Sequence, residues 1–317
     1  MQFTFLGTSS GVPTTSRNVS GLAIRCDDKK SWCLVDCGEA TQHQLLRTSY
    51  SLAKLEAIFI THVHGDHCFG LPGLLASAAM NARRLPLVVV GPAPLKHFLD
   101  AALRATCLNL NYELSFIDVS SLQDSISAAG MDVSRVELSH RVPSYAYCFT
   151  AGRKKTRLLT LKLQQQGVPA GPLWGRLQSG MDVDLEDGTT LKSADYIVSF
   201  VQQQRVLVGG DNDSPQLLSA AEELDVIIHE ATYDEATLKA SKRDYGHSSA
   251  AGIAAYTQAA GVKNLVLTHF SPRYHGRENA EALLQLETEA RQAFSGNLHL
   301  ASDLDTFQLK EGELIKL

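Results

Sequence analysis

The stretch that decides the fold is THVHGDH, residues 61–67, which directly follows the apolar run AIFI at residues 57–60. It places three histidines and one aspartate within six residues, where a predicted strand ends and a glycine permits a turn. Each of these side chains can donate a lone pair to a borderline divalent cation such as zinc. Solvated surface loops also accumulate polar residues, but this ligand order at a strand end is typical of a metal site.

Length and composition are those of an ordinary globular protein. The chain has 317 residues, of which 44% are hydrophobic and 20% are charged, enough for one large α/β domain or two smaller ones. The N-terminal residues 3–7 favour a strand, with no basic leader and no apolar run of bilayer length. We therefore expect a cytoplasmic protein that needs no membrane.

The charge is unevenly distributed, although its net value of -5 argues against a polyanionic partner. Residues 151–181 contain six of the 29 basic residues and no acidic one, which leaves 23 basic against 34 acidic residues elsewhere. A cationic segment on an anionic body is typical of an appendage that binds a polyanion. A solvated loop that carries its lysines for solubility is the alternative.

Strand-like and helical segments alternate along the chain, which predicts an α/β fold with two mixed sheets packed face to face and helices outside. The glycines and prolines of residues 167–176 interrupt this pattern. We expect one domain over residues 1–317, with residues 151–181 inserted as a protruding arm. Polar residues follow six predicted strand ends, and these residues are Asp36, His62, His140, Asp211, His229 and His269.

Three of these residues could complete a two-metal site. Two cations roughly 3.5–4 Å apart can activate water and stabilise both the entering and the leaving oxygen of a phosphoryl displacement. The four loop side chains would then need two more histidines and a bridging carboxylate. His140, Asp211 and His269 fit that need by position, although each one alone could equally be a satisfied structural residue.

Several longer strings resemble the ribonuclease Z family of tRNA 3′-processing endonucleases, in its short bacterial form, within the metallo-β-lactamase fold superfamily. The His-x-His-x-Asp-His loop is specific only to the superfamily. The family strings are FLGTSSGVPTTSRN (5–18), VDCGEATQHQLL (35–46), GVPAGPLWGRLQSG (167–180), HEATY (229–233), GHSS (246–249) and THFSPRY (268–274). Together they span nearly the whole chain, so the resemblance implies a metallo-β-lactamase αββα sandwich.

The resemblance also implies two zinc ions per subunit, for which manganese or cobalt could substitute. The implied ligands of the first ion are His62, His64, His140 and Asp211. Those of the second are Asp66, His67, His269 and again Asp211, as the bridge. Asp36 would orient a ligand histidine from behind.

The implied catalytic residues are Asp66, His247 and Glu230. Asp66 would orient or deprotonate the attacking water, and His247 would protonate the departing ribose oxygen. A carboxylate beside an imidazole fixes the tautomer of the ring and keeps it available as a general acid. This chemistry supports the pairing of His247 with Glu230 independently of the resemblance. Without the resemblance, His247 would be only a neighbour of the predicted helix start at residue 248.

The implied partners are precursor tRNA and a second copy of the chain in a homodimer. The implied substrate-binding residues are Arg17, Asn18, Lys154, Lys155, Arg157, Gly171, Pro172 and Arg273. Thr15 departs from the family, which usually has a basic residue there, so discrimination against tRNA that already carries CCA is in doubt.

The expected function is therefore a metal-dependent endoribonuclease that removes 3′ trailers from precursor tRNA. One alternative is a phosphodiesterase of the same fold that acts on small phosphodiesters, for which a cationic arm would be unnecessary. A second alternative is a non-catalytic RNA-binding scaffold, which a complete ligand set disfavours.

Overall fold

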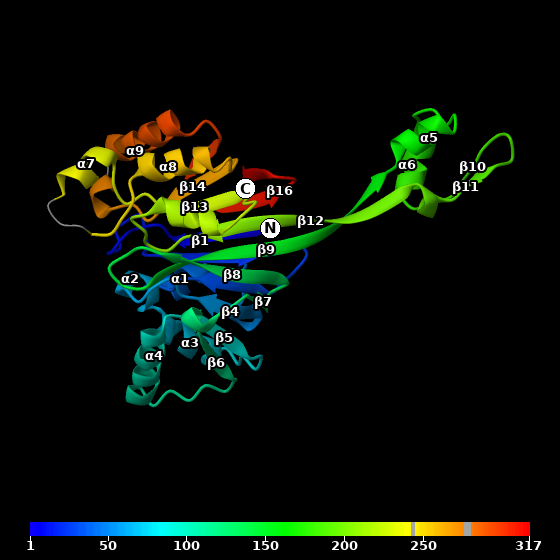
Figure 1. The fold of residues 1–317 in the computed structure, drawn as a ribbon. Coiled ribbons are helices and arrows are strands. Elements are labelled where there is room, and N and C mark those ends of the chain that lie inside the picture. Colours follow the sequence, from blue (N-terminus) through cyan, green and yellow to red (C-terminus); the bar gives the residue numbers. More distant parts are fainter. Residues whose placement is uncertain (242–244, 276–279) are drawn as a thin grey trace. The chain divides into compact units, whose positions relative to one another are not determined.

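The computed structural model describes residues 1–241, 245–275 and 280–317, which form two compact units (Figure 1). The first unit comprises Met1–Ala151 and Gln204–Leu317, and the second comprises Gly152–Gln203. Among the described helices, none combines the length and the apolar character needed to span a bilayer.

An eight-stranded mixed sheet opens the first unit, with strand order β17-β16-β1-β2-β3-β4-β5-β6. The strands from β3 to β6 run parallel, and the other pairs are antiparallel. Their bounds are β1 Gln2–Gly7, β2 Gly21–Arg25, β3 Trp32–Val35, β4 Leu55–Phe59, β5 Leu87–Gly91, β6 Leu114–Asp118, β16 Thr306–Lys310 and β17 Glu313–Lys316.

A seven-stranded mixed sheet faces it, with strand order β15-β14-β13-β12-β9-β8-β7. The strands from β12 to β15 are parallel, and β7, β8 and β9 pair antiparallel. Their bounds are β7 Ser125–Ala128, β8 Met131–Leu138, β9 Ser144–Leu158, β12 Ile197–Val208, β13 Val226–Glu230, β14 Asn264–Thr268 and β15 Asn297–Leu300. β9 and β12 each cross the boundary between the units, which lies between Ala151 and Gly152 in β9 and between Gln203 and Gln204 in β12.

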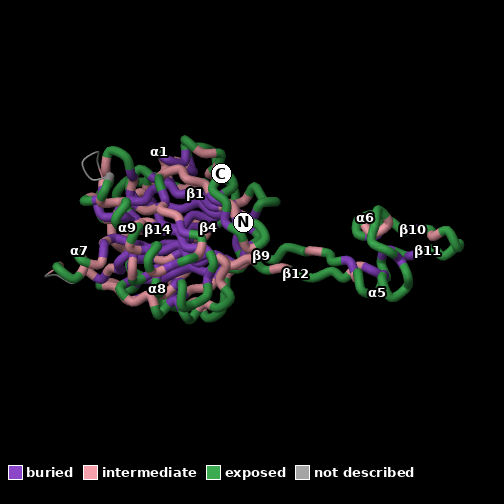
Figure 2. Tube along the Cα trace, turned by 90° about the horizontal axis from the view of Figure 1, so that it is seen from above, coloured by how far each residue is buried: buried purple, intermediate pink, exposed green. Residues whose placement is uncertain are grey.

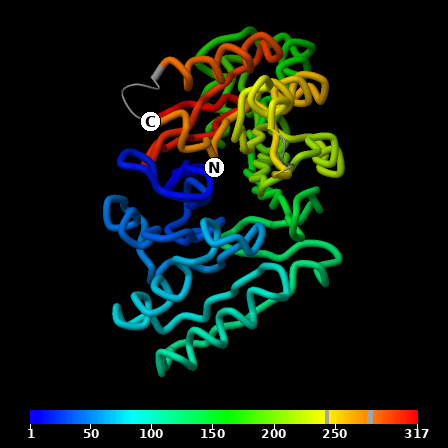
Figure 3. The backbone as a smooth tube through the Cα atoms, turned by 90° about the vertical axis from the view of Figure 1, so that its left-hand side faces the viewer, coloured from blue at the N-terminus to red at the C-terminus, as the bar shows by residue number. Residues whose placement is uncertain are grey.

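The two sheets enclose an apolar core, and helices cover their outer faces, so the expected αββα sandwich is confirmed (Figure 3). Phe3, Phe5, Phe59, Tyr147 and Phe307 belong to one buried cluster to which strands of both sheets contribute. The buried stretches of the chain gather in the interior of this unit (Figure 2). Burial of these large apolar side chains stabilises the sandwich. The helices of this unit are α1 Thr41–Leu45, α2 Gly65–Cys68, α3 Leu71–Met80, α4 Ala93–Ala105, α7 Glu235–Ala240, α8 Ala250–Ala259 and α9 Ala280–Ala293.

The second unit has a small apolar cluster of its own. Helices α5 Thr160–Gln165 and α6 Pro172–Gln178 and the hairpin β10 Val183–Asp184 with β11 Thr190–Leu191 contribute to it. Its buried members are Leu158, Leu163, Val168, Leu177, Val183, Leu191 and Tyr196. This unit continues past the basic segment, because the chain from residue 182 to Gln203 supplies the hairpin and much of β12.

Short 3-10 helices lie in both units, at Leu52–Lys54, Val119–Ser121, Ser193–Asp195, Pro215–Ala220 and Pro272–Tyr274.

Candidate metal centre

The candidate ligands lie where strands of both sheets end. His62 and His64 follow β4, and Asp66 and His67 lie in the short helix α2 that starts at Gly65. The other three follow β8, β12 and β14, and these residues are His140, Asp211 and His269. Strand ends from the two sheets therefore bring together all seven predicted metal ligands, which all belong to the first unit.

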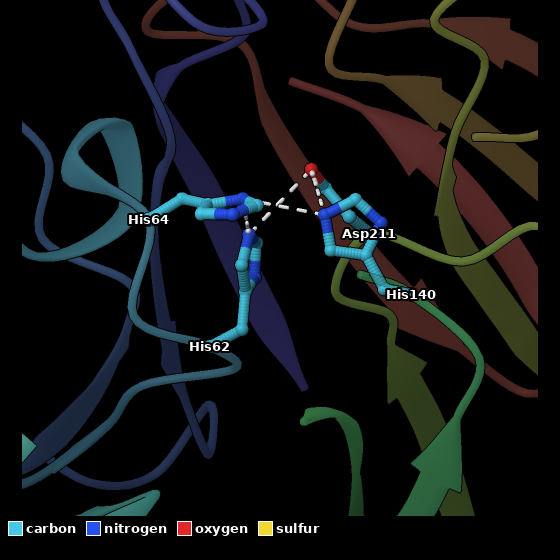
Figure 4. A group of neighbouring side chains, drawn as sticks. All are labelled: His62, His64, His140 and Asp211. Atoms are coloured by element: carbon cyan, nitrogen blue, oxygen red, sulfur yellow. Dashed lines mark hydrogen bonds and ion pairs between the residues drawn. The ribbon is translucent and has the colours of Figure 1, made fainter. Parts of the chain in front are cut away.

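The first group of donor atoms combines two loop histidines with His140 and Asp211 (Figure 4). His64 Nδ1 lies 3.1 Å from His62 Nε2 and 3.2 Å from His140 Nε2. Asp211 Oδ2 lies 3.6 Å from His62 Nε2 and 3.8 Å from His140 Nε2. Three imidazoles and one carboxylate thus direct their donor atoms at one small volume.

The second group is formed by Asp66, His67 and His269. His67 Nε2 lies 3.2 Å from His269 Nε2 and 3.4 Å from Asp66 Oδ2, and the other oxygen of Asp211, Oδ1, lies 3.5 Å from His67 Nε2. His269 Nε2 lies 3.3 Å from Asp66 Oδ2 and 3.4 Å from Asp211 Oδ1. Asp211 therefore directs one carboxylate oxygen at each group.

Both groups fit a divalent cation such as zinc. Four donors at about 2.0–2.1 Å from one zinc ion would lie about 3.3–3.4 Å from each other in a tetrahedron. The distances in the two groups bracket that value, and imidazole and carboxylate are the donors that zinc, manganese and cobalt share.

Hydrogen bonds on the far side of the imidazoles direct their lone pairs into the site. His67 Nδ1 donates to Asp36 Oδ2 over 2.7 Å. The Thr61 hydroxyl donates to the same carboxylate and accepts from His62 Nδ1 over 3.1 Å. In both rings the proton is on Nδ1, on the side away from the ligand group, so Nε2 keeps a free lone pair that faces the ligand group.

His140 and His269 are oriented in the same way. His140 Nδ1 donates to the Gly246 carbonyl over 2.7 Å, and His269 Nδ1 lies 3.0 Å from Thr232 Oγ1, which accepts its proton. Gly246 has a φ of +70°, and a Cβ on it would meet His140 Nδ1 at 2.7 Å. This position therefore requires glycine, because a side chain would displace a candidate ligand.

The electrostatics of the cluster favour bound positive charge. Burial opposes protonation of His67, but the nearby Asp66, Asp36 and Asp211 carboxylates raise its pKa well above the usual value. Burial opposes ionisation of Asp66, yet the charge of His67 and hydrogen bonds from His269 and His67 hold its pKa well below the usual range. Burial and the neighbouring imidazoles lower the pKa of His62. A divalent cation satisfies the same need for positive charge.

Glu230 and His247 form an ion pair beside the two ligand groups. Glu230 is 1% exposed, and its Oε1 accepts the Asn212 backbone N–H over 2.7 Å. The Thr232 hydroxyl donates to Oε2, and His247 Nδ1 lies 3.0 Å from the same oxygen. Burial disfavours a charged His247, but the Glu230 carboxylate outweighs it and raises the pKa of His247 to about 9. The pair therefore keeps a proton available at neutral pH.

Two residues of the site hold backbone conformations that side chains rarely adopt. Asp36 and His269 both have a φ of +57°, in the left-handed region. Such conformations cost about 1–3 kcal/mol each and persist only where the surrounding structure enforces them.

The residues predicted to bind substrate differ in their surroundings. Arg17 is only 7% exposed, and its guanidinium donates to Thr8 Oγ1, the Ala301 carbonyl and His275 Nδ1. These hydrogen bonds hold Arg17 within the fold, and its role in substrate binding stays a prediction. Asn18 is half-buried and donates to the Glu39 carbonyl.

The remaining predicted substrate-binding residues are not members of the two ligand groups. Arg273 is exposed and lies over the ring of Tyr233 at 5.2 Å. The others belong to the second unit, and these residues are Lys154, Lys155, Arg157, Gly171 and Pro172.

Sequence reasoning missed the neutral residues that orient the ligands. Thr61, Thr232, Asn212 and Gly246 each contact a ligand or Glu230. Three of them adjoin a predicted site residue in sequence, namely Thr61, Asn212 and Gly246, and this adjacency is the signal that could have indicated them.

Comparisons with known proteins agree with this geometry. Residues 1–161 match the family model described as Anti-Pycsar protein Apyc1. Proteins named Ribonuclease Z from Marinobacter nauticus and Pseudomonas putida are each 47% identical over 98% of this chain and cover 97% and 96% of their own lengths. The crystal structure of human tRNase Z, short form, superposes with a TM-score of 0.65 over 98% of this chain and 100% of that one, at 24% identity. The chain therefore belongs to the ribonuclease Z family and is a metal-dependent nuclease with the metallo-β-lactamase fold.

Proposed function

We propose that this protein is an endoribonuclease that removes the 3′ trailer from precursor tRNA and leaves a 3′-hydroxyl on the tRNA. One observation carries the proposal: relatives named Ribonuclease Z are 47% identical to the chain over 98% of its length. With precursor tRNA as the substrate, the place of action is the cytoplasm.

The proposed cofactors are two zinc ions, one in each ligand group. When bound, they would supply the positive charge that activates water and stabilises the phosphoryl transition state. Asp211 would be shared between them, since its two oxygens face different groups. Manganese or cobalt could replace zinc with the same donors.

Asp66 and His247 would act on the attacking water and on the leaving group. Asp66 would orient the attacking water with a carboxylate that its low pKa keeps ionised at neutral pH. The proton of that water would be lost to solvent, because two bound cations would lower its pKa to near neutrality. His247 would donate its Nε2 proton to the departing 3′ oxygen of the ribose. Glu230 holds Nδ1, so it fixes the ring orientation in which Nε2 can reach the leaving group.

The second unit, Gly152–Gln203, would bind the body of the tRNA through phosphate contacts, which give affinity without sequence information. Side chains alternate along a strand, so Arg153, Lys155 and Arg157 of β9 share one face and Lys154 lies on the other. Gly171 and Pro172, at the start of α6, would approach the tRNA backbone.

We also propose a homodimer in which the second unit of one subunit presents the substrate to the metal centre of its partner. The family resemblance of the sequence supports this arrangement. Chains with Asp211→Ala should be inactive, as should chains in which the basic residues of β9 are neutralised. Mixing the two should restore activity if the arrangement is correct, because a mixed dimer joins one intact metal centre to one intact second unit.

The decisive experiment incubates the purified chain with 3′-extended precursor tRNA, with and without a chelator, and sequences the cleaved ends. Metal-dependent cleavage to one product with a 3′-hydroxyl would support the proposal. The second candidate is a hydrolase of small phosphodiesters, favoured by a complete ligand set within the first unit. It would be supported by turnover of bis(p-nitrophenyl) phosphate together with intact precursor tRNA.

A further inference from the structure

The loop between β1 and β2 reaches the second ligand group. The backbone N–H of Gly11 donates to Asp66 Oδ2 over 2.7 Å. That oxygen is the donor atom of the group, since it lies 3.4 Å from His67 Nε2 and 3.3 Å from His269 Nε2. One exposed loop thus directs a hydrogen bond at a candidate ligand atom.

The same loop also contacts the residue that follows His269. The Phe270 N–H donates to the Thr8 carbonyl over 2.9 Å, and the Ser10 N–H donates to the Phe270 carbonyl over 3.0 Å. These two bonds hold the chain next to His269, whose φ of +57° needs support from its surroundings. The loop therefore restrains two of the three residues that belong to the second group alone.

The first group has different supports. Within the described residues, the hydrogen bonds of His62 and His140 go to Thr61, Gly246 and His64. The loop between β1 and β2 supplies none of these bonds. Its contacts therefore distinguish the second group from the first.

The loop is itself held firmly at its base. Arg17 Nη1 donates to Thr8 Oγ1 over 2.6 Å and to the Ala301 carbonyl over 2.5 Å. The guanidinium also lies over the Phe270 ring at 5.0 Å. Ser9 Oγ donates to the Val12 carbonyl over 2.7 Å and closes the turn that presents Gly11. The Gly11 N–H therefore has a fixed direction.

We infer that this loop, residues 8–18, is a positioning element for the second cation, and that Gly11 acts through Asp66. The inference rests on the proposed two-metal centre. A hydrogen bond to a carboxylate fixes its rotamer and the direction of its lone pairs, and loss of such an outer partner typically weakens metal binding about 10–100-fold. The effect should fall on the second ligand group and leave the first unchanged.

Gly11 offers a matched pair of variants. Its φ is +70°, and a Cβ placed on it would meet no atom within 4 Å. Gly11→Asn keeps the N–H, and asparagine tolerates the left-handed conformation. Gly11→Pro removes the N–H and cannot adopt that φ. Ser9→Ala is a milder third variant, because it opens the turn and leaves the Gly11 N–H in place.

The test titrates metal-free full-length chains with Co²⁺ and then Zn²⁺ against a competing chelator, and follows the visible Co²⁺ spectrum. Wild type should bind two cations per chain. Gly11→Pro should bind one cation with unchanged affinity and the other, at the second ligand group, about 10–100-fold more weakly, so that the weakened site fills in the second step. Ser9→Ala should show a smaller loss of affinity at that step. Gly11→Asn should stay within about threefold of wild type at both steps.

Equal affinities of wild type and Gly11→Pro at the second step would overturn the inference, as would an equal loss at both steps. If Gly11→Pro does not fold, a second step unchanged in Ser9→Ala would have the same meaning. A wild-type chain that binds a single cation would instead overturn the two-metal centre, and with it this inference.

Discussion

Replacing Glu230 by glutamine should shift the pH dependence of precursor tRNA cleavage. The Glu230 carboxylate raises the pKa of His247 to about 9, against an ordinary value of 6.5. Without it, burial opposes protonation of His247 while the Asp211 carboxylate still favours it, so the pKa should fall toward its ordinary value. For a pKa at that ordinary value, the protonated fraction of His247 at pH 8 falls from about 90% to about 3%, a loss of about 30-fold in rate. At pH 6 the loss should be less than about twofold.

The assay measures single-turnover cleavage of precursor tRNA between pH 5.5 and 9.5, beside hydrolysis of bis(p-nitrophenyl) phosphate. p-Nitrophenolate leaves without a proton, so the small substrate should lose little at any pH. Glutamine can keep the local hydrogen bonds, because the Thr232 hydroxyl has the His269 carbonyl as a second acceptor at 3.0 Å.

Glu235→Gln is the matched control. This residue also carries a carboxylate near the start of α8, but its side chain pairs with Lys239 and accepts from Ser249. Glu235→Gln should leave the fall in cleavage rate at alkaline pH where it is in the wild type, near pH 9. An unmoved alkaline limb in Glu230→Gln, or equal losses on both substrates, would refute the role of His247 as the proton donor.

Three further predictions concern the arm, the bridge and Arg17. Neutralising Arg153 and Arg157 together should raise KM for precursor tRNA and should reduce the slope of log binding constant against log salt concentration by about 1–2. Lys154→Gln, on the opposite face of β9, should have smaller effects on both quantities. Equal effects would contradict the proposal that the face with Arg153 and Arg157 contacts the tRNA. Asp211→Asn should reduce bound zinc from two ions per chain to fewer than one, because one carboxylate serves both groups, as elemental analysis would report. Arg17→Met should lower the free energy of unfolding, measured in urea, by about 1–3 kcal/mol, because it removes two buried hydrogen bonds. A higher KM for precursor tRNA without a loss of stability would instead support the predicted role of Arg17 in substrate binding.

The sequence contained most of the metal centre because its ligands are tied to strand ends. The apolar run before THVHGDH becomes β4, and the histidines at residues 140 and 269 follow strands that local hydrophobicity also indicates. The division of the Asp211 oxygens between two groups could not be read in the same way. It depends on how two sheets face each other across the core, which no local pattern specifies.

The second unit and Arg17 show where local patterns fail. β9 extends through the basic segment to Leu158, where exposure on both faces removes the apolar alternation that marks a strand. β12 is continuous from Ile197 to Val208, although a run of three glutamines, residues 202–204, divides its apolar residues. The burial of Arg17 depends on the tertiary structure, because the Ala301 carbonyl that accepts from its guanidinium lies 284 residues away along the chain.

The spacing of the ligands along the chain has a consequence for biosynthesis. His67 leaves the ribosome long before His269, and at roughly 5–20 residues per second the interval is roughly 10–40 s. Throughout that interval the growing polypeptide lacks its last ligand, His269, and for most of it Asp211, which faces both ligand groups, is also missing. A complete ligand set therefore exists only after most of the message has been translated.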